Sequence, residues 1–460
     1  MSILVIFSLI VKCIGAVLEI GSQALVSQLW SVEIYGEYAF FVALADGFYA
    51  LFFSGIIKFN NFFIPRGECV KFFRKKYYKY YVIPICLIGI IVGVVLKKPV
   101  AICAFFAGFT YLCAMDTSSR MMSYGRYKPA LIGEYCIGRT FVVLAVLVFS
   151  LMHAKNLVIL YLVYGMQFFI ALIYYFIINK KNPFPEQTKV LDNHALSKYA
   201  VFQSTEIAHT IIMQSSVIVQ YIFGGAFQTA LISIVLVVRK LINFISGPTS
   251  KLYQPEFSKR FNAGDRKGLS DVYAQITRIQ LCFMMPVFML LIAKPEIILR
   301  VFNRDLIEYG WLVRITAIVF ISMIAFGPLS NFLPMIGHER IDSIINWTSV
   351  FVMYLSMIIF RSNQYFVVIG FCAQLLYVNI VKLIVFVRYM KRMPMPAKDY
   401  FLIVMLYGVC SVILQFLPEN LVLAFVVCAM HFAANFIIVF PKEDFKDIIQ
   451  KMQSRKRKNG

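Results

Sequence analysis

The chain has 460 residues, of which 60% are hydrophobic and only 15% are charged, and its mean hydropathy is +0.76. A soluble chain of this length would fold into two or three domains with amphipathic helices, whereas apolar runs of about 20 residues recur along this whole sequence, as in transmembrane helices. The net charge of +22 does not indicate a nucleic-acid-binding protein, because the basic residues cluster in alternate loops, as they do on the cytoplasmic side of membrane proteins.

Run length and turn signals predict an all-α polytopic membrane protein with about fourteen transmembrane helices. In chain order, the predicted helices span residues 3–29, 36–62, 79–97, 99–117, 129–151, 156–178, 198–222, 226–248, 274–298, 310–335, 342–361, 364–388, 399–417 and 420–440.

A weak internal repeat relates two pairs of these helices. The stretch SQALVSQLW (22–30) resembles QSSVIVQYI (214–222), and each is followed by a short turn, a second long helix and a proline. Duplicated six-helix halves are common in transporters, with the substrate path at their interface. We therefore predict two pseudo-symmetric six-helix lobes plus two extra C-terminal helices. The limits are 1–190 for the N-lobe, 191–392 for the C-lobe, 393–440 for the extra helices and 441–460 for a basic cytoplasmic tail.

The basic loops also predict the orientation of the chain. One set of alternate loops, together with the tail, carries most of the loop lysines and arginines, for example at 66–79, 251–267 and 442–458. This asymmetry places both termini in the cytoplasm. The external loops are short, so they leave no room for a folded catalytic domain outside the membrane.

Signatures of enzymes and cofactors are missing from the sequence. It has no Gly-rich phosphate loop with Lys-Ser/Thr, no HExxH and no GxSxG motif. The ten cysteines include no pair with metal-ligand spacing. We therefore expect a protein that is not an enzyme and that needs neither a cofactor nor a metal.

Ionisable residues interrupt the apolar runs of the first two predicted helices: Lys12, Glu19, Asp46 and Lys58. Such a group near the bilayer centre costs about 2.5–3.5 kcal/mol on insertion scales, so these helices should face protein or a watery cavity. Lys12 and Glu19 lie on one face of their helix, and Gln23 continues it. This stripe either lines a central cavity or forms a salt-bridge face that joins helices.

Asp46 lies near the middle of its helix, so its carboxyl group is either paired with a base or protonated. Either state suits a group that exchanges a proton or a sodium ion for substrate movement, and a structural role is the alternative. Helix 198–222 repeats the theme with Glu206 and Gln214 on one side, and helix 226–248 carries Arg239 and Lys240. Under the repeat alignment, Arg239 falls one position from the equivalent of Asp46. This predicts a cavity between helices 3–29, 36–62, 198–222 and 226–248.

Other ionisable residues lie in later helices: Glu134 and Arg139 in 129–151, Arg314 near the external end of 310–335, and Lys382 deep in 364–388. Arg314 could equally be an interfacial anchor. Bases outnumber acids within the predicted transmembrane helices, so a cavity between them would be basic. A basic cavity fits a diphosphate or an acidic sugar. The predicted substrate residues are Lys12, Gln23, Arg139, Gln214, Arg239, Lys240, Arg314 and Lys382, and the predicted ion-coupling residues are Glu19, Asp46, Glu134 and Glu206.

Four stretches carry a resemblance to a known family: IYGEYAFFVAL (34–44), QPEFSKRFNAGDRKGL (254–269), AKPEIILRVFNRDLIEYGWLVRI (293–315) and LPMIGHERI (333–341). With them, the chain resembles the polysaccharide flippases of the Wzx type. Their superfamily includes multidrug exporters and lipid II flippases, and this chain lacks the arginine-rich first helix typical of the lipid II branch.

The resemblance implies a V-shaped bundle of two six-helix lobes that works by alternating access, with antiport of H+ or Na+. The implied substrate is an undecaprenyl-diphosphate-linked oligosaccharide, the repeat unit of O-antigen or capsule, which crosses the bacterial inner membrane. Implied partners are membrane lipid, a polysaccharide polymerase and a chain-length regulator, with no nucleic acid. The alternatives are a membrane-embedded O-antigen polymerase, which typically needs a large external loop with arginines, and a small-molecule exporter of the multidrug type.

Overall fold

A computed structural model describes residues 3–64, 68–95, 97–185, 195–329, 332–333, 336, 338–418 and 420–439, with only the backbone described at some positions in these ranges. Helices form almost all of this described part, and short turns join them. The prediction of an all-α polytopic membrane protein is confirmed.

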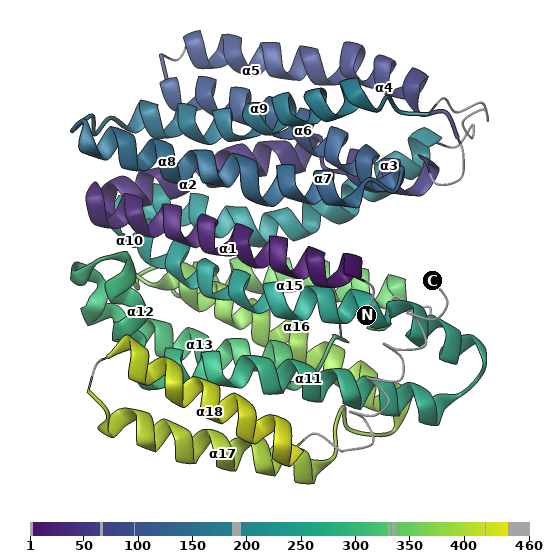
Figure 1. Cartoon of the computed structure of the whole chain (residues 1–460), viewed down its shortest axis with the longest axis vertical. Coiled ribbons are helices and arrows are strands. Elements are labelled where there is room, and N and C mark those ends of the chain that lie inside the picture. Colours follow the sequence, from purple (N-terminus) through teal and green to yellow (C-terminus); the bar gives the residue numbers. More distant parts are fainter. Residues whose placement is uncertain are drawn as a thin grey trace. The chain divides into compact units, whose positions relative to one another are not determined.

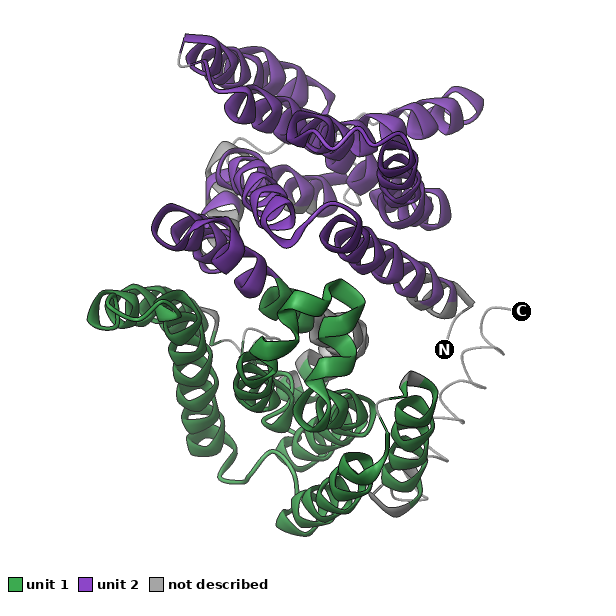
Figure 2. Cartoon of the chain, turned by 90° about the vertical axis from the view of Figure 1, so that its left-hand side faces the viewer, with its two compact units in different colours: residues 1–2, 234–460 green, residues 3–233 purple. Residues whose placement is uncertain are grey.

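Two compact units divide the chain, and Figure 2 draws them in different colours. We call Ile3–Ser233 the N-terminal unit and Ile234–Gly460 the C-terminal unit. The division falls inside the long helix α10 (Ala195–Asn262) and groups its first half with the helices before it. The predicted lobe limits at 1–190, 191–392 and 393–440, and the predicted basic tail, stay predictions.

The N-terminal unit contains the helices before α10 and the first part of α10 itself. Their bounds are α1 Ile3–Leu29, α2 Val32–Phe52, α3 Gly55–Phe63, α4 Lys71–Tyr77, α5 Ile83–Val95, α6 Pro99–Ser123, α7 Tyr127–Ile132, α8 Gly138–Leu151 and α9 Leu157–Lys181, with the π-helical turns η2 Tyr78–Val82 and η3 Gly133–Ile137. Helices α4 and α5 join through η2 into one span, Lys71–Val95, and α7 and α8 join through η3 into another, Tyr127–Leu151.

Helix α6 is central to the N-terminal unit, because it packs against α2, α3, α5 and α9 (Figure 1). Helix α1 packs against α2 and α8. Between α3 and its neighbours lies an aromatic core in which Phe53, Phe59 and Phe63 are fully buried. Packing of this kind holds the break between α2 and α3 inside protein.

The C-terminal unit begins with the second part of α10. Its other helices are α11 Arg266–Ala293, α12 Pro295–Phe302, the 3-10 helix η4 Arg304–Tyr309, α13 Gly310–Ala325, α15 Glu339–Ile359, α16 Phe366–Met390, α17 Ala397–Phe416 and α18 Leu421–Val439. Helix α11 packs against α13, α17 and α18, and α16 packs against α13 and α15.

In the described part of the chain, eleven helices are long and apolar enough to cross a membrane, or twelve if α2 and α3 form one bent span. Helix α10 counts once, although Gly225 (φ 79°, ψ −175°) interrupts it between the predicted helices 198–222 and 226–248. In α18 the apolar stretch is shorter, Val422–Asn435. The total of about fourteen therefore stays a prediction.

The single helix predicted over 36–62 is wrong. The structure has two helices, α2 and α3, which break at Phe53 and Ser54 and bend by 50°. A Ser-Gly pair, Ser54 and Gly55, follows α2, and the Ser54 hydroxyl donates to the Ala50 carbonyl at 2.8 Å. Such pairs are a known cause of sharp helix bends, because the side chain competes for backbone hydrogen bonds.

Gly36 is a close-contact position, where α2 meets α10. A Cβ atom at Gly36 would lie 1.8 Å from the Ala226 carbonyl oxygen, and a backbone atom cannot turn aside as a side chain can. We expect Gly36→Ala to lower the free energy of unfolding by about 1–3 kcal/mol. Thermal unfolding in detergent measures this, with Gly21→Ala as the control because open space surrounds Gly21. An unchanged unfolding temperature for Gly36→Ala would contradict the contact.

Candidate functional site

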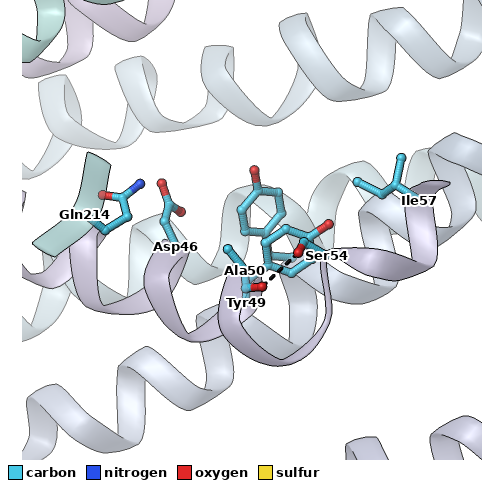
Figure 3. A pocket seen from close by; sticks show the side chains of 7 residues that line it. Asp46, Tyr49, Ala50, Ser54, Ile57 and Gln214 are labelled. Atoms are coloured by element: carbon cyan, nitrogen blue, oxygen red, sulfur yellow. Dashed lines mark hydrogen bonds between the residues drawn. The ribbon is translucent and has the colours of Figure 1, made fainter. Parts of the chain in front are cut away.

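A pocket opens beside the break between α2 and α3, within the N-terminal unit. Its volume is about 340 Å³, and Figure 3 shows the side chains that line it: Asp46, Tyr49, Ala50, Ser54, Ile57, Tyr111 and Gln214. Asp46, Tyr49 and Ala50 share one face of α2 because they are three and four residues apart. Gln214 comes from α10 and lies next to Asp46 in the view. The sequence-predicted residues Asp46 and Gln214 are thus brought together.

Asp46 is the only acidic residue in the described lining of this pocket. Its carboxylate accepts a hydrogen bond from the Tyr164 hydroxyl of α9. The ring of Tyr111 stacks on that of Tyr49, with centroids 4.2 Å apart, and on that of Phe168, with centroids 4.3 Å apart. A carboxylate framed by aromatic faces is suited to bind a proton, a sodium ion or an organic cation.

The polar stripe of α1 meets α8. Arg139 Nη2 lies 2.8 Å from Glu19 Oε2, and Arg139 Nη1 donates to the Gly15 carbonyl at 2.7 Å. Both ionic side chains are about one-quarter exposed, so the pair is only partly shielded from its surroundings. The structure therefore brings Glu19 and Arg139 together in a contact that joins two helices.

Three other predicted residues lie around the same helices. Lys12 Nζ lies 5.8 Å from the ring centre of Tyr135, within range of a cation–π interaction. Gln23 Oε1 accepts a hydrogen bond from the Tyr35 hydroxyl at 3.1 Å, which ties α1 to α2. Glu134 accepts one from the Ser118 hydroxyl at 3.0 Å, so it bonds to α6 and not to Arg139 on its own segment.

Arg239 is buried in the C-terminal unit, where its side chain lies over the Phe371 ring of α16 at 5.1 Å. Within the described residues, its Nε and Nη1 atoms have no hydrogen-bond partner. A buried charge without hydrogen bonds is costly, and a guanidinium presents a fork that matches a phosphate. Arg239 is therefore suited to receive an anion, while its neighbour Lys240 is exposed.

The other two predicted bases of this unit form ion pairs. Lys382 on α16 is 1% exposed, and its Nζ lies 2.7 Å from Asp342 Oδ1 on α15. Arg314 on α13 lies 2.5 Å from Glu296 Oε1 on α12. The side chains of Glu206 and Lys58 lie outside the described residues. The predicted four-helix cavity draws on both units and stays a prediction.

Asp116 is a buried acidic residue that the sequence did not reveal. The helix predicted over 99–117 placed it at a helix end, whereas α6 continues to Ser123 and buries it fully. Arg74 Nε donates to both Asp116 oxygens at 3.1 and 3.0 Å, and Asn60 Nδ2 donates at 2.8 Å. Arg120, four residues on, also pairs with it. The spacing of Asp116 and Arg120 within a longer helix was the available signal.

Removing this carboxylate should cost much stability, because two arginine charges would then lose their partner. We expect Asp116→Ala to lower the free energy of unfolding by about 3–5 kcal/mol. Thermal unfolding checks this, with the exposed Glu33→Ala as the control, whose expected loss is below about 1 kcal/mol. The double variant Asp116→Leu with Arg74→Met should recover part of the loss. Equal unfolding temperatures for Asp116→Ala and Glu33→Ala would refute the role.

A second missed pair joins α11 to α17. Arg278 Nε lies 2.7 Å from Asp399 Oδ2. The two residues are far apart in the sequence, and Asp399 stands at the start of its predicted helix, so no local pattern relates them. Like the pairs of Lys382 and Arg314, it links two helices of the C-terminal unit.

Sequence comparison finds no matching protein-family model and no matching curated protein. Solved structures match at the level of fold. The lipid II flippase MurJ, in an inward closed conformation, matches with a TM-score of 0.68 and 13% identity over 96% of this chain and 99% of its own. An inward-facing MATE family multidrug resistance transporter of the MOP superfamily matches with a TM-score of 0.62 and 12% identity over 84% and 98%. The chain therefore shares the fold of these two structures.

A further match is the MATE multidrug transporter DinF-BH, solved in complex with a ligand, with a TM-score of 0.55 and 15% identity over 84% of this chain and 94% of that one. At these identities the likeness is one of fold. The all-helical fold that the resemblance implies is thus shared with these structures, while membership of the superfamily and of its Wzx type stays a prediction.

Proposed function

We propose that this chain is a flippase that moves an undecaprenyl-diphosphate-linked oligosaccharide, the repeat unit of O-antigen or capsule, across the bacterial inner membrane. The observation that carries the proposal is the fold shared with a lipid II flippase over 96% of the chain. Transport would proceed by alternating access, with both termini in the cytoplasm and without covalent chemistry.

Arg239 would bind the diphosphate of this substrate. Its burial and its two guanidinium nitrogens without hydrogen-bond partners among the described residues support the assignment. A phosphate oxygen pair would supply the missing acceptors, since guanidinium and phosphate form two parallel hydrogen bonds. Asp46 would couple transport to an ion gradient by taking up a proton or a sodium ion, because its carboxylate stands within the pocket of the N-terminal unit.

A multidrug exporter is the second candidate function. The aromatic and acidic lining around Asp46 favours it, because an organic cation would find a carboxylate and stacked rings there. The likeness to MATE transporters, one of them solved in complex with a ligand, supports the same possibility.

Deleting the gene separates these two functions from each other, and both from that of a polymerase, in cells. The flippase proposal expects lipid-linked single repeat units to accumulate on the cytoplasmic leaflet and surface polysaccharide to disappear. Repeat units that reach the periplasm unpolymerised would refute it and favour the polymerase. Lost drug resistance with unchanged surface polysaccharide would favour the exporter.

A further inference from the structure

We propose that Gln203 is a positioning residue that inserts its side-chain amide into the break between α2 and α3 and thereby shapes the pocket around Asp46. We call this inserted amide the wedge. Gln203 lies on the first part of α10 and is 8% exposed. It does not line the pocket. Its amide instead contacts the backbone where α2 ends and α3 begins, and this contact is the basis of the inference.

The break leaves backbone groups without their helical partners. In a continuous helix the Leu51 carbonyl would accept from the Gly55 amide, which is four residues on. Here Gln203 takes both places: its Oε1 accepts from the Gly55 amide at 2.7 Å, and its Nε2 donates to the Leu51 carbonyl at 2.6 Å. The side-chain amide thus stands in the gap of the hydrogen-bond ladder, which is one of the recognised causes of a kink.

Two further contacts hold the same segment. Gln203 Nε2 also donates to the Ala50 carbonyl at 2.7 Å, and the Tyr199 hydroxyl, one turn earlier on α10, lies 3.3 Å from the Phe52 carbonyl. Three successive carbonyls, from Ala50 to Phe52, are therefore met by side chains of α10. In a membrane such satisfaction matters, because an unpaired backbone group costs several kcal/mol there.

Gly55 shows that the contact is also close in steric terms. A Cβ atom at this position would lie 2.8 Å from Gln203 Oε1 and 3.0 Å from the Tyr199 ring. Any larger residue would thus displace the wedge, and a glycine stands there. The fit between the break and α10 is steric as well as polar.

The held segment includes part of the pocket lining. Ala50 and Ser54 line the pocket, and Asp46 lies one turn before Ala50 on α2 (Figure 3). Gln203 therefore sets where these groups stand without touching a ligand. The inference that this position matters for transport rests on the proposed function, whereas the wedge itself does not.

The test replaces the wedge by an apolar side chain of similar length, Gln203→Met. Without the Gln203 amide, the Leu51 carbonyl and the Gly55 amide should form a hydrogen bond with each other, because unpaired backbone groups are costly in the membrane. The distance between spin labels at residues 33 and 61, introduced through noncanonical amino acids, should lengthen by about 3 Å, the difference between a straight rod and one bent by 50°. The hydrogen-exchange rate of the Gly55 amide should stay within about twofold of its rate in the wild type.

Two comparisons complete the design. Gly55→Ala should straighten the helix in the same way, because the added methyl group would displace the side chain of an intact Gln203. This variant replaces Gln203→Met in the test if Gln203→Met does not fold. Gln167→Met makes the same change at a buried glutamine of α9 and should leave the label distance unchanged. Transport by the Gln203→Met variant should fall, although Asp46 itself is not substituted.

An unchanged label distance would overturn the wedge, because packing alone would then impose the bend. A rise of about tenfold in the exchange rate of the Gly55 amide would also overturn it, because that amide would then not have paired with the Leu51 carbonyl. These readouts use purified protein and do not depend on transport, so failure of the wedge and failure of the proposed function are distinguishable.

Discussion

Arg239→Ala is expected to abolish transport of the lipid-linked oligosaccharide while the protein still inserts and folds. The substrate diphosphate would lose its charged partner, and removing one member of a buried charge pair costs about 2–5 kcal/mol of binding free energy. Arg239→Lys should retain part of the activity, because an ammonium keeps the charge without the planar fork. Surface polysaccharide and substrate binding to purified protein measure the effect.

The matched control for this prediction is Arg304→Ala, which removes an exposed arginine from the same unit. It should leave both measurements unchanged, since its charge is solvated. Full surface polysaccharide in the Arg239→Ala strain would exclude Arg239 from the substrate site.

Asp46→Asn is also expected to abolish gradient-driven transport. The substitution keeps the size of the side chain and an oxygen that can accept from the Tyr164 hydroxyl, so the pocket should keep its shape. It removes only the capacity to carry a charge and to bind a proton or a sodium ion. The loss of transport would then result from the missing carboxylate charge and not from a change in packing.

Glu33→Gln makes the same change at an exposed acidic residue of α2 and should behave as the wild type. Uptake into vesicles with and without an imposed proton or sodium gradient measures the coupling. If Asp46→Asn still responds to either gradient as the wild type does, Asp46 is not the coupling residue.

The sequence predicted the helices well where their limits depend on local signals. The bounds of α1 agree at both ends with the predicted 3–29, and α18 agrees with 420–440 to within a residue at each end. The interruption at Gly225 also lies between the two helices predicted there. Apolar run length and turn residues are properties of neighbours in the chain, so they can be read directly.

The break between α2 and α3 could not be predicted in the same way. The residue that occupies the gap, Gln203, lies about 150 positions from Leu51, and only the fold brings them together. Ser54 and Gly55 were a local signal for a bend, but they do not indicate which side chain fills the gap.

Buried charges were visible in the sequence, but their partners were not. Glu19 and Arg139 were both predicted as site residues, yet their pairing depends on how α1 packs on α8. Asp342, the partner of Lys382, looked like a residue at a helix start. Ion pairing between helices depends on the tertiary structure. The sequence therefore showed that ionisable residues lie within the predicted transmembrane helices, but it did not show which residues they pair with.

Translocation by the purified protein in vesicles tests the central claim most directly. Vesicles would carry an undecaprenyl-diphosphate-linked oligosaccharide in both leaflets, and a membrane-impermeant glycosidase outside would report which molecules are reachable. The account predicts that the inner-leaflet pool becomes cleavable when wild-type protein is present and stays protected with Arg239→Ala. An inner pool that stays fully protected in vesicles containing folded wild-type protein under a proton or a sodium gradient would contradict the account.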